Sequence, residues 1–231
     1  MNYLSREQEK SFLGTGENNC QGQSLQEFLD QYDPNAYQNP SNTVDTLVFT
    51  YIIENDIKKI SRLLMVKRSN HPGIGWWALP GGFVEYKEDL DVAARRELKE
   101  ETGIDDIEIE QLGCFGDHDR DPRTRIITTA YVALVSEGSL KAVAGDDAAE
   151  TGWFDIKDEV LSKEKGHETH LLSMEDESGK IKLQATVEMN WRPDAVLKNM
   201  KYTVTEKNLL YADHGAILLE GYHYIKKLLE E

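Results

Sequence analysis

The chain has 231 residues, 39% of them hydrophobic and 29% charged, which is enough to bury one large core or two smaller ones. Its formal net charge of −16 argues against nonspecific nucleic-acid binding, so an anionic ligand would have to be held by cations and local arginines. Two cysteines are too few for a disulfide framework or a zinc cage, and no signal peptide or run of about twenty apolar residues is seen, so we expect a cytoplasmic protein without membrane contact.

The first residues differ in composition from the rest of the chain. Residues 1–42 are rich in Asn, Gln, Ser and Gly and predict a polar N-terminal arm with one short helix, at 24–32. The sequence then becomes apolar, and residues 44–53 and 62–67 predict two strands of a hairpin with a polar turn between them. We therefore expect residues 43–231 to form the folded domain.

Residues 81–104 read GGFVEYKEDLDVAARRELKEETGI. Leu90, Ala94 and Leu98 recur at a spacing of four, which predicts a helix with one apolar face. The Pro-Gly-Gly sequence before this helix predicts a turn, and the Thr-Gly sequence after it predicts the end of the helix.

Three glutamates of this helix, Glu97, Glu100 and Glu101, lie within about a turn and a half, where positions three and four apart are neighbours on one face. Carboxylate oxygens are ligands that Mg²⁺ prefers, so this face is a candidate metal site. Basic residues between the glutamates, among them Arg95 and Arg96, allow a second interpretation, in which the face is solvated and carries ordinary ion pairs. The spacing of the glutamates alone leaves both interpretations open.

Beyond the helix, residues 107–115 and 125–135 predict strands, and a further short strand is expected at 152–154. Strands on both sides of a helix indicate a mixed α/β domain. Residues 157–205 contain charged stretches and a Ser-Gly hairpin turn, and we interpret them as an insertion. The last helix is expected at 213–229, with an aspartate at its N-cap position.

The register of the glutamate helix is also that of a known family. Gly82 is followed at fixed spacings by Glu88, Arg96-Glu97-Leu98, Glu100-Glu101 and Gly103-Ile104, and this pattern over 23 residues resembles the signature box of the Nudix hydrolases. The resemblance implies an α/β Nudix fold, a mixed β-sheet sandwiched between helices, in which the box forms a loop, a helix and a loop.

The same resemblance implies roles for individual residues. Glu97 and Glu101 would be the principal ligands of Mg²⁺, with Mn²⁺ as the alternative ion, and Glu100 would be a further ligand or the general base. The Gly81 carbonyl would supply another oxygen. Arg96 would hold a neighbouring carboxylate in its ligating rotamer. Glu100, Glu101 and Arg96 are thus the expected catalytic residues.

Four further segments, residues 115–123, 144–148, 153–154 and 211–214, resemble the branch that contains ADP-ribose pyrophosphatases and the Nudix-related regulators of NAD-metabolism genes. This resemblance covers most of residues 24–154 and the final helix. It implies a Mg-dependent pyrophosphohydrolase that cleaves a nucleoside diphosphate linked to another moiety, with ADP-ribose first, giving AMP and ribose 5-phosphate. It also implies a homodimer.

The alternative is a regulator or a noncatalytic binding protein that senses ADP-ribose or another NAD metabolite. Such regulators carry a DNA-binding winged helix after the Nudix domain, whereas residues 153–231 hold 11 Lys and Arg against 15 Asp and Glu, and the chain stops where that module would begin. An intact acidic box also favours catalysis, because a pure sensor does not need every metal ligand.

Arginines are the candidates for binding the phosphates or ribose of such a substrate. Arg120 and Arg123 lie in an Asp-Arg-Asp-Pro-Arg run, a sequence that is equally typical of a tight turn, and Arg68 follows a strand. His118 in the same loop is a candidate general base, although an exposed loop histidine is the more common case.

Acidic residues of a later loop, Asp146, Asp147 and Glu150, are further candidates for contact with the metal ions, and such a loop acid is the alternative to Glu100 as the general base. Asp146 and Asp147 are equally typical of a turn cap after a glycine. His167 and His170 lie three apart, but no cysteine or acidic residue accompanies them at a clear spacing. We do not infer a zinc site from this pair.

Overall fold

A computed structural model describes residues 3–140, 148–197 and 199–230. The chain divides into two compact units, Met1–Asn39 and Pro40–Glu231, so the first unit ends slightly before the predicted boundary at residue 42. The first unit contains two helices and a short 3-10 helix, α1 (Arg6–Glu9), α2 (Leu25–Gln31) and η1 (Lys10–Phe12). Ser24 caps α2, the helix that the sequence predicts in this unit.

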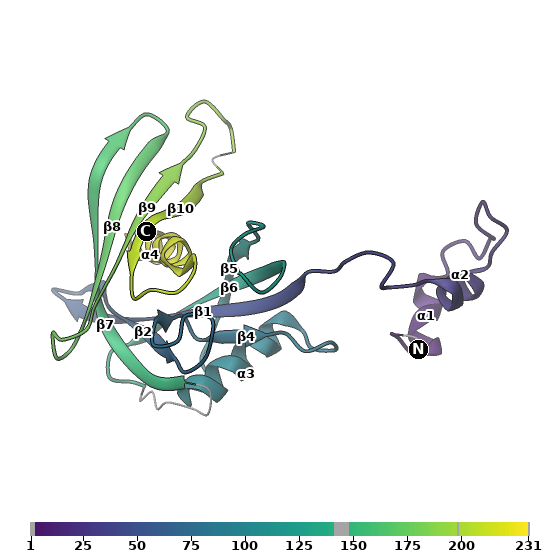
Figure 1. The fold of residues 1–231 in the computed structure, drawn as a ribbon, viewed down its shortest axis with the longest axis horizontal. Coiled ribbons are helices and arrows are strands. Elements are labelled where there is room, and N and C mark those ends of the chain that lie inside the picture. The colour runs from purple at the N-terminus through teal and green to yellow at the C-terminus, as the bar shows by residue number, and fades with distance from the viewer. Residues whose placement is uncertain (1–2, 141–147, 198, 231) are drawn as a thin grey trace. The chain divides into compact units, whose positions relative to one another are not determined.

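The second unit is one mixed sheet with a long helix against each face (Figure 1). Its helices are α3 (Leu90–Thr102) and α4 (His214–Glu230), and its strands are β1 (Ser41–Glu54), β2 (Ile57–Arg68), β3 (Trp77–Ala78), β4 (Gly81–Phe83), β5 (Glu110–Phe115), β6 (Ile126–Ser136), β7 (Ala148–Glu164), β8 (His167–Asp176), β9 (Lys182–Asn190) and β10 (Lys201–Asn208). In the described part of the chain the strand order is β10-β9-β8-β7-β2-β1-β6-β5, with β3 beside β2 and β4 beside β1. Strands β1 and β6 are parallel, and the other pairs are antiparallel.

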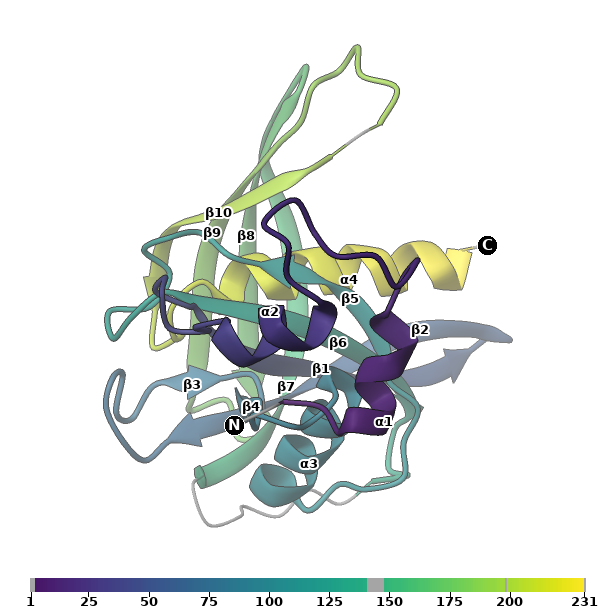
Figure 2. The same cartoon turned by 90° about the vertical axis from the view of Figure 1, so that its right-hand side faces the viewer.

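The central strand β1 is buried on both faces. Leu47 and Phe49 join the core beneath α4, whereas Val44 and Val48 belong to the clusters that contain residues of α3. This alternation follows from the two-residue period of a strand. It explains why the strand reads as a nearly continuous apolar run. Figure 2 shows α4 lengthwise, across the strands that it covers.

The hairpin predicted at the start of the domain is present as β1 and β2. Its two turn residues, Asn55 and Asp56, have φ angles of 52° and 63°. Both angles lie in the left-handed region, as a two-residue type I′ turn requires, and Asn and Asp tolerate that region better than most residues.

The turn expected at Pro-Gly-Gly is instead the short strand β4, which pairs with residues 43–45 of β1. A Cβ atom on Gly81 would lie 2.0 Å from the carbonyl oxygen of Val44. The glycine is therefore needed because two backbones approach closely here, and strand pairing replaces the predicted turn.

The segment at 157–205 consists of long strands in the structure. The short strand expected at 152–154 is part of β7, and β8, β9 and β10 follow as successive antiparallel strands that extend the sheet. Buried and less buried side chains alternate along β8 and β9. Five of the buried ones belong to the core that also contains residues of α4: Leu172, Met174, Leu183, Ala185 and Val187. That the segment is an insertion stays a prediction.

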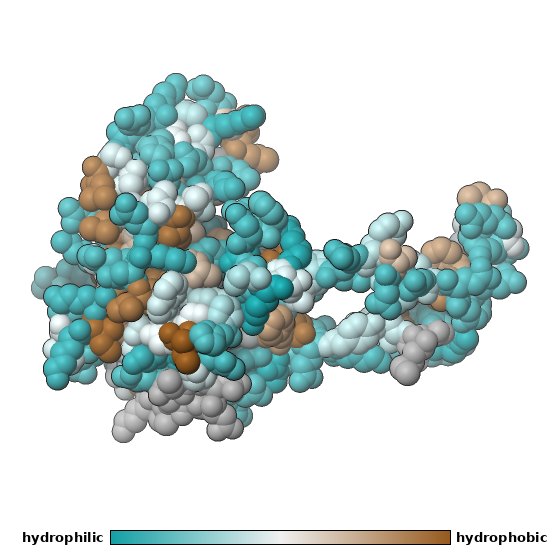
Figure 3. All heavy atoms as spheres, viewed as in Figure 1, coloured by the Kyte–Doolittle hydropathy of each residue, from teal (hydrophilic) through white to brown (hydrophobic). Residues whose placement is uncertain are grey.

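The surface shown in Figure 3 is mostly hydrophilic, with separate apolar patches. Cys20 and Cys114 are exposed and not bonded to each other. None of the described helices combines the length and the apolar character needed to cross a bilayer.

Candidate active site

The glutamate helix is α3, and its buried face differs slightly from the predicted one. Ala94 and Leu98 are buried as predicted, but Leu90 is 37% exposed and Ala93 is buried instead. Leu90 is the first residue of the helix, so its side chain lies at the end of the packed face. Gly103 ends the helix with a φ of 69°, the left-handed conformation that the Thr-Gly sequence predicts.

Two carboxylates of this helix face the short strand β4. The backbone N–H of Gly81 donates a hydrogen bond of 2.9 Å to Oε2 of Glu101. A Cβ atom on Gly82 would lie 2.5 Å from the carboxyl carbon of Glu97, so only glycine leaves room for this carboxylate. The structure thus brings Gly81, Glu97 and Glu101 together, as the sequence predicts.

Ionisation of both carboxylates is unfavourable in the protein without a bound cation. Burial raises the pKa of Glu101 to about 7 against the hydrogen bond from Gly81, and the charges of Glu97 and Asp45 add to the rise. Burial also raises the pKa of Glu97, although hydrogen bonding to Arg96 opposes the rise. Partly buried oxygen ligands that repel one another fit a hard divalent cation, because the cation relieves that repulsion.

Arg96 organises the acidic residues around it. Its Nε and Nη2 donate hydrogen bonds of 2.8 Å to the two oxygens of Glu88, and its Nη1 donates to Oε1 of Glu97 at 2.7 Å. The bonds to Arg96 lower the pKa of Glu88 to about 2. Asp89, the residue after Glu88, occupies the N-cap position of α3. Arg96 therefore fixes the direction in which Glu97 points, and its role in orienting a metal ligand stays a prediction.

Glu100 lies apart from the other two glutamates of the box. Its side chain is 59% exposed and accepts a bond of 3.1 Å from Nη1 of Arg96. It is not among the described residues that line the adjacent cleft. Its role as a metal ligand or general base stays a prediction.

The cleft beside the two buried carboxylates has a volume of about 420 Å³. It lies between strands β1, β2 and β4, helix α3, the loop after β5 and the start of α4. Its polar lining includes Asp45, Arg68, Glu97, Glu101, Arg120, Arg123, Tyr211 and His214.

All three predicted arginines line this cleft, but they differ in their exposure and in their partners. Arg68 lies with its guanidinium 4.1 Å from the centre of the Tyr211 ring. Arg123 is 40% exposed and pairs with Asp121. Arg120 is only 6% exposed, and two of its nitrogens donate to the carboxylate of Asp213 at 2.9 Å.

Asp213 is the aspartate predicted to cap the last helix. Its carbonyl oxygen accepts from the N–H of Ala216 at 2.8 Å, which agrees with an N-cap position. Its side chain binds Arg120. The pair with Arg120 therefore connects the loop after β5 to the start of α4.

Two residues at the floor of the cleft were not predicted as site residues. Asp45 accepts a hydrogen bond of 2.6 Å from the Thr128 hydroxyl, and Nε2 of His214 lies 3.8 Å from its other oxygen. Nδ1 of His214 accepts from the N–H of Leu79 at 2.9 Å, and burial lowers the pKa of His214. Asp45 interrupts the apolar run of β1, which is the signal in the sequence that could have identified it.

The remaining loop candidates lie elsewhere. The His118 side chain is 87% exposed, as expected for an ordinary loop histidine. Glu150 pairs with Lys67 at 3.3 Å and is not among the described residues that line the cleft. Asp146 and Asp147 lie outside the described residues.

The curated relatives of the chain include an enzyme and a transcriptional repressor. An ADP-ribose pyrophosphatase of Methanocaldococcus jannaschii is 43% identical over 104 residues, which are 45% of this chain and 60% of that protein. The ADPR responsive transcriptional repressor NtrR of Acinetobacter baylyi is 40% identical over 115 residues, which are 49% of this chain and 44% of that protein. The matches therefore span less than two thirds of either relative.

A solved structure shares the fold over nearly the whole chain. The MutT/nudix family protein from Enterococcus faecalis has a TM-score of 0.63 and 28% identity, and the match covers 97% of this chain and 76% of that protein. Residues 46–175 match the NUDIX domain. Because this match spans more than half of the sequence, the chain belongs to the NUDIX domain family.

Proposed function

We propose that the chain is a metal-dependent pyrophosphohydrolase that cleaves ADP-ribose to AMP and ribose 5-phosphate. The observation that carries the proposal is the pair of partly buried carboxylates, Glu97 and Glu101, that lines a cleft together with three arginines. The similarity to the Methanocaldococcus jannaschii ADP-ribose pyrophosphatase, at 43% identity, supports ADP-ribose as the first substrate to test.

Glu97 and Glu101, with the carbonyl of Gly81, would hold Mg²⁺, with Mn²⁺ as the alternative. Bound there, the ion would neutralise the diphosphate and lower the pKa of a water molecule. Arg96 keeps Glu97 in place through its bond of 2.7 Å. Glu101 and Glu100 are both proposed catalytic residues. Glu101 lines the cleft, whereas Glu100 is hydrogen-bonded to Arg96 and is not among the described residues that line it.

Arg68, Arg120 and Arg123 are the proposed substrate-binding residues. A guanidinium can donate two parallel hydrogen bonds to a phosphate. The side chains of Arg68 and Arg123 are partly exposed to solvent where they line the cleft. Arg120 donates two hydrogen bonds to Asp213, so it also positions the start of α4. Arg120 thereby helps to keep His214, the next residue after Asp213, at the cleft floor.

The test is to incubate the full chain with ADP-ribose, other nucleoside diphosphate sugars, NADH and diadenosine polyphosphates, with and without Mg²⁺, and to separate the products by chromatography. We expect Mg²⁺-dependent formation of AMP and ribose 5-phosphate from ADP-ribose. Glu101→Gln should lower turnover by about a hundredfold or more, because a metal ligand is lost.

The matched control is Glu108→Gln, which makes the same change at a fully exposed carboxylate. It should keep the activity of the unaltered chain. Equal losses in the two variants, or no turnover of any compound, would contradict the proposed hydrolase.

The second candidate function is the binding of ADP-ribose without hydrolysis, as a sensor or regulator. The observation that favours it is the 40% identity to the ADPR responsive repressor. Calorimetric titration with ADP-ribose separates the candidates, since tight binding without any product would support the sensor.

We also propose that the chain acts as a homodimer in the cytoplasm, without a nucleic-acid or membrane partner. Its net charge of −16 supports the absence of a nucleic-acid partner. Light scattering should give about twice the chain mass of 26.3 kDa, and a mass equal to that of one chain would contradict the dimer.

A further inference from the structure

A second group of metal-ligating side chains lies outside the cleft, between helix α4 and the β7–β8 hairpin. Asp158 comes from β7, His170 from β8 and His223 from α4. Their ligand atoms all lie within 4.8 Å of one another. One hairpin and one helix that are distant in sequence thus converge on one point.

The three side chains already contact one another. Oδ1 of Asp158 lies 2.8 Å from Nδ1 of His170, and Oδ2 lies 3.0 Å from Nε2 of His223. The two imidazole rings lie edge to face with their centres 5.0 Å apart. Around a zinc ion with bonds of about 2.0–2.1 Å, tetrahedral ligand atoms are about 3.3 Å apart, so small shifts of these side chains would suffice to bind it.

The outer contacts of His170 resemble those of a ligating histidine. Its second nitrogen, Nε2, lies 3.3 Å from Oε2 of Glu168, and the other oxygen of Glu168 lies 2.7 Å from Nζ of Lys163. Both ring nitrogens therefore face carboxylates. With its N–H directed at Glu168, the ring offers the lone pair of Nδ1 to the cluster, which is the carboxylate–histidine–metal arrangement common in metalloproteins.

The group is largely shielded from solvent. The exposed fractions of the side chains are 2% for His170, 8% for Asp158 and 25% for His223. The cluster therefore presents a carboxylate and two imidazoles, one of them close to solvent.

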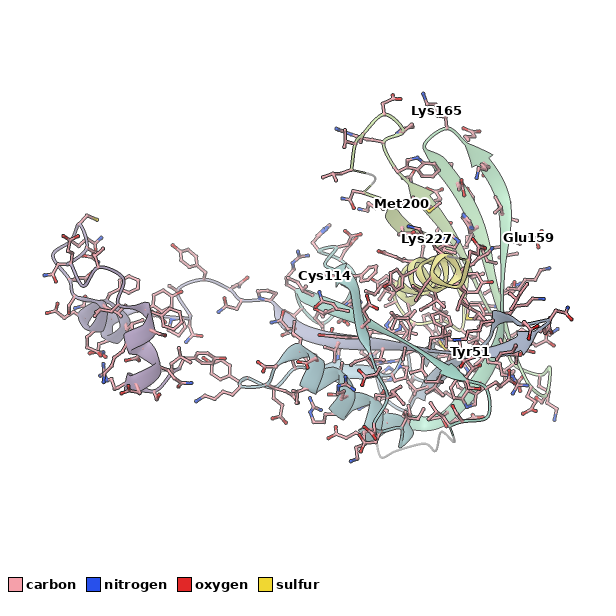
Figure 4. The ribbon with its side chains drawn as sticks, turned by 180° about the vertical axis from the view of Figure 1, so that it is seen from behind. Tyr51, Cys114, Glu159, Lys165, Met200 and Lys227 are labelled. Carbon is pink, nitrogen blue, oxygen red and sulfur yellow. The ribbon has the colours of Figure 1, made fainter. Side chains whose placement is uncertain are left out.

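The cluster is separate from the cleft. His223 follows His214 by nine positions, which corresponds to about 13 Å along a helix. Figure 4 labels Glu159, which follows Asp158 in β7, and Lys227, which lies about one turn after His223 in α4, and both labels stand well away from α3.

We propose that Asp158, His170 and His223 bind a divalent transition-metal ion, Zn²⁺ first, and that this ion fastens helix α4 to the β7–β8 hairpin. Two imidazoles and one carboxylate are the ligand set of several zinc sites with an open fourth position. Mg²⁺ prefers oxygen ligands, so it should not compete here. The ion would stabilise the folded chain by mass action, because the unfolded chain does not bring the three ligands together.

The test uses the full chain in saturating Mg²⁺, which occupies the glutamates of the cleft if they bind it. Calorimetric titration with Zn²⁺ should show one additional ion per chain. Substitution with Co²⁺ should give the visible absorption bands of a nitrogen-ligated ion of low coordination number. Zn²⁺ should also raise the melting temperature of the chain.

His223→Ala should weaken Zn²⁺ binding by about a hundredfold or more and abolish the rise in melting temperature. His118→Ala is the matched control, because it removes a histidine that is 87% exposed and should leave both readouts unchanged. Equal Zn²⁺ affinity in the two variants would overturn the proposal. Circular dichroism without metal checks that His223→Ala is folded. If it is not, a Co²⁺ titration of the unaltered chain that produces no such bands would overturn the proposal by itself.

Discussion

Arg96 connects three glutamates of the box, although it is not among the described residues that line the cleft. Its planar group donates to both oxygens of Glu88 and reaches Glu97 at the same time. A lysine carries one nitrogen and cannot form this set of bonds. The position of Glu97 therefore depends on the shape of the arginine as well as on its charge.

We expect Arg96→Lys to lower metal-dependent turnover about 10- to 100-fold, because Glu97 loses the group that orients it. The effect should be partly rescued by higher Mg²⁺ concentration if the change weakens metal binding. Steady-state kinetics over a series of Mg²⁺ concentrations measures both effects.

Arg95→Lys provides the control at the neighbouring position. Arg95 is 42% exposed and lies near the exposed Glu108. If Arg95→Lys lowers turnover as much as Arg96→Lys, the orienting role of Arg96 is wrong.

The sequence predicts the box residues well, because their spacing is fixed by one helix and one adjoining loop. Glu97, Glu101 and Gly81 meet as expected. Asp45 and His214 escape prediction because they join the same cleft from distant segments. The pairing of such residues depends on the tertiary fold, and a single aspartate or histidine has no spacing pattern of its own.

At the scale of elements, α4 contributes to the core, to the cleft and to the cluster with Asp158. Its apolar residues Ile217, Leu218 and Ile225 are buried. The strands beneath α4 are less predictable from the sequence. Charged residues and register shifts such as the one after Val160 interrupt the alternating pattern, so the sequence alone indicates only a Ser-Gly hairpin turn within residues 157–205.

Glu220, a residue of α4, makes the folding stability of the chain dependent on pH. Burial raises the pKa of its carboxyl above the ordinary value. The folded chain then binds this proton more readily than the unfolded chain, so folding stability falls as pH rises from about 4.3 through the raised value. Glu220→Gln removes this loss, and its stability relative to the unaltered chain should increase with pH over that window.

Urea unfolding at several pH values between 4.5 and 8 measures this difference. Glu159→Gln is the control, since the side chain of Glu159 is 56% exposed and avoids most of the cost of burial. A difference between Glu220→Gln and the unaltered chain that does not change with pH would contradict the explanation.

At the scale of the whole molecule, the two compact units are unequal in their cores. The buried hydrophobic side chains among the described residues begin at Val44 and end at Ile225, all within the second unit. The first unit has short helices with capping boxes but no comparable core. Polar composition predicted this difference, because such a segment has little apolar surface to bury.

We expect a chain that begins at Pro40 to fold with a single cooperative transition, because it retains every buried hydrophobic residue of the described core. Calorimetry and far-ultraviolet circular dichroism of the shortened chain test this expectation. A broad transition without a heat-absorption peak would show that residues 1–39 are needed for folding.

Helix α4 carries His214 in the cleft at one end and His223 about two and a half turns later. A ligand bound at either place would affect how the same helix packs against the sheet. By thermodynamic reciprocity, if an ion at His223 strengthens nucleotide binding in the cleft by some factor, the nucleotide strengthens ion binding by that same factor. The activity of the chain would then report the availability of a metal that takes no part in the reaction.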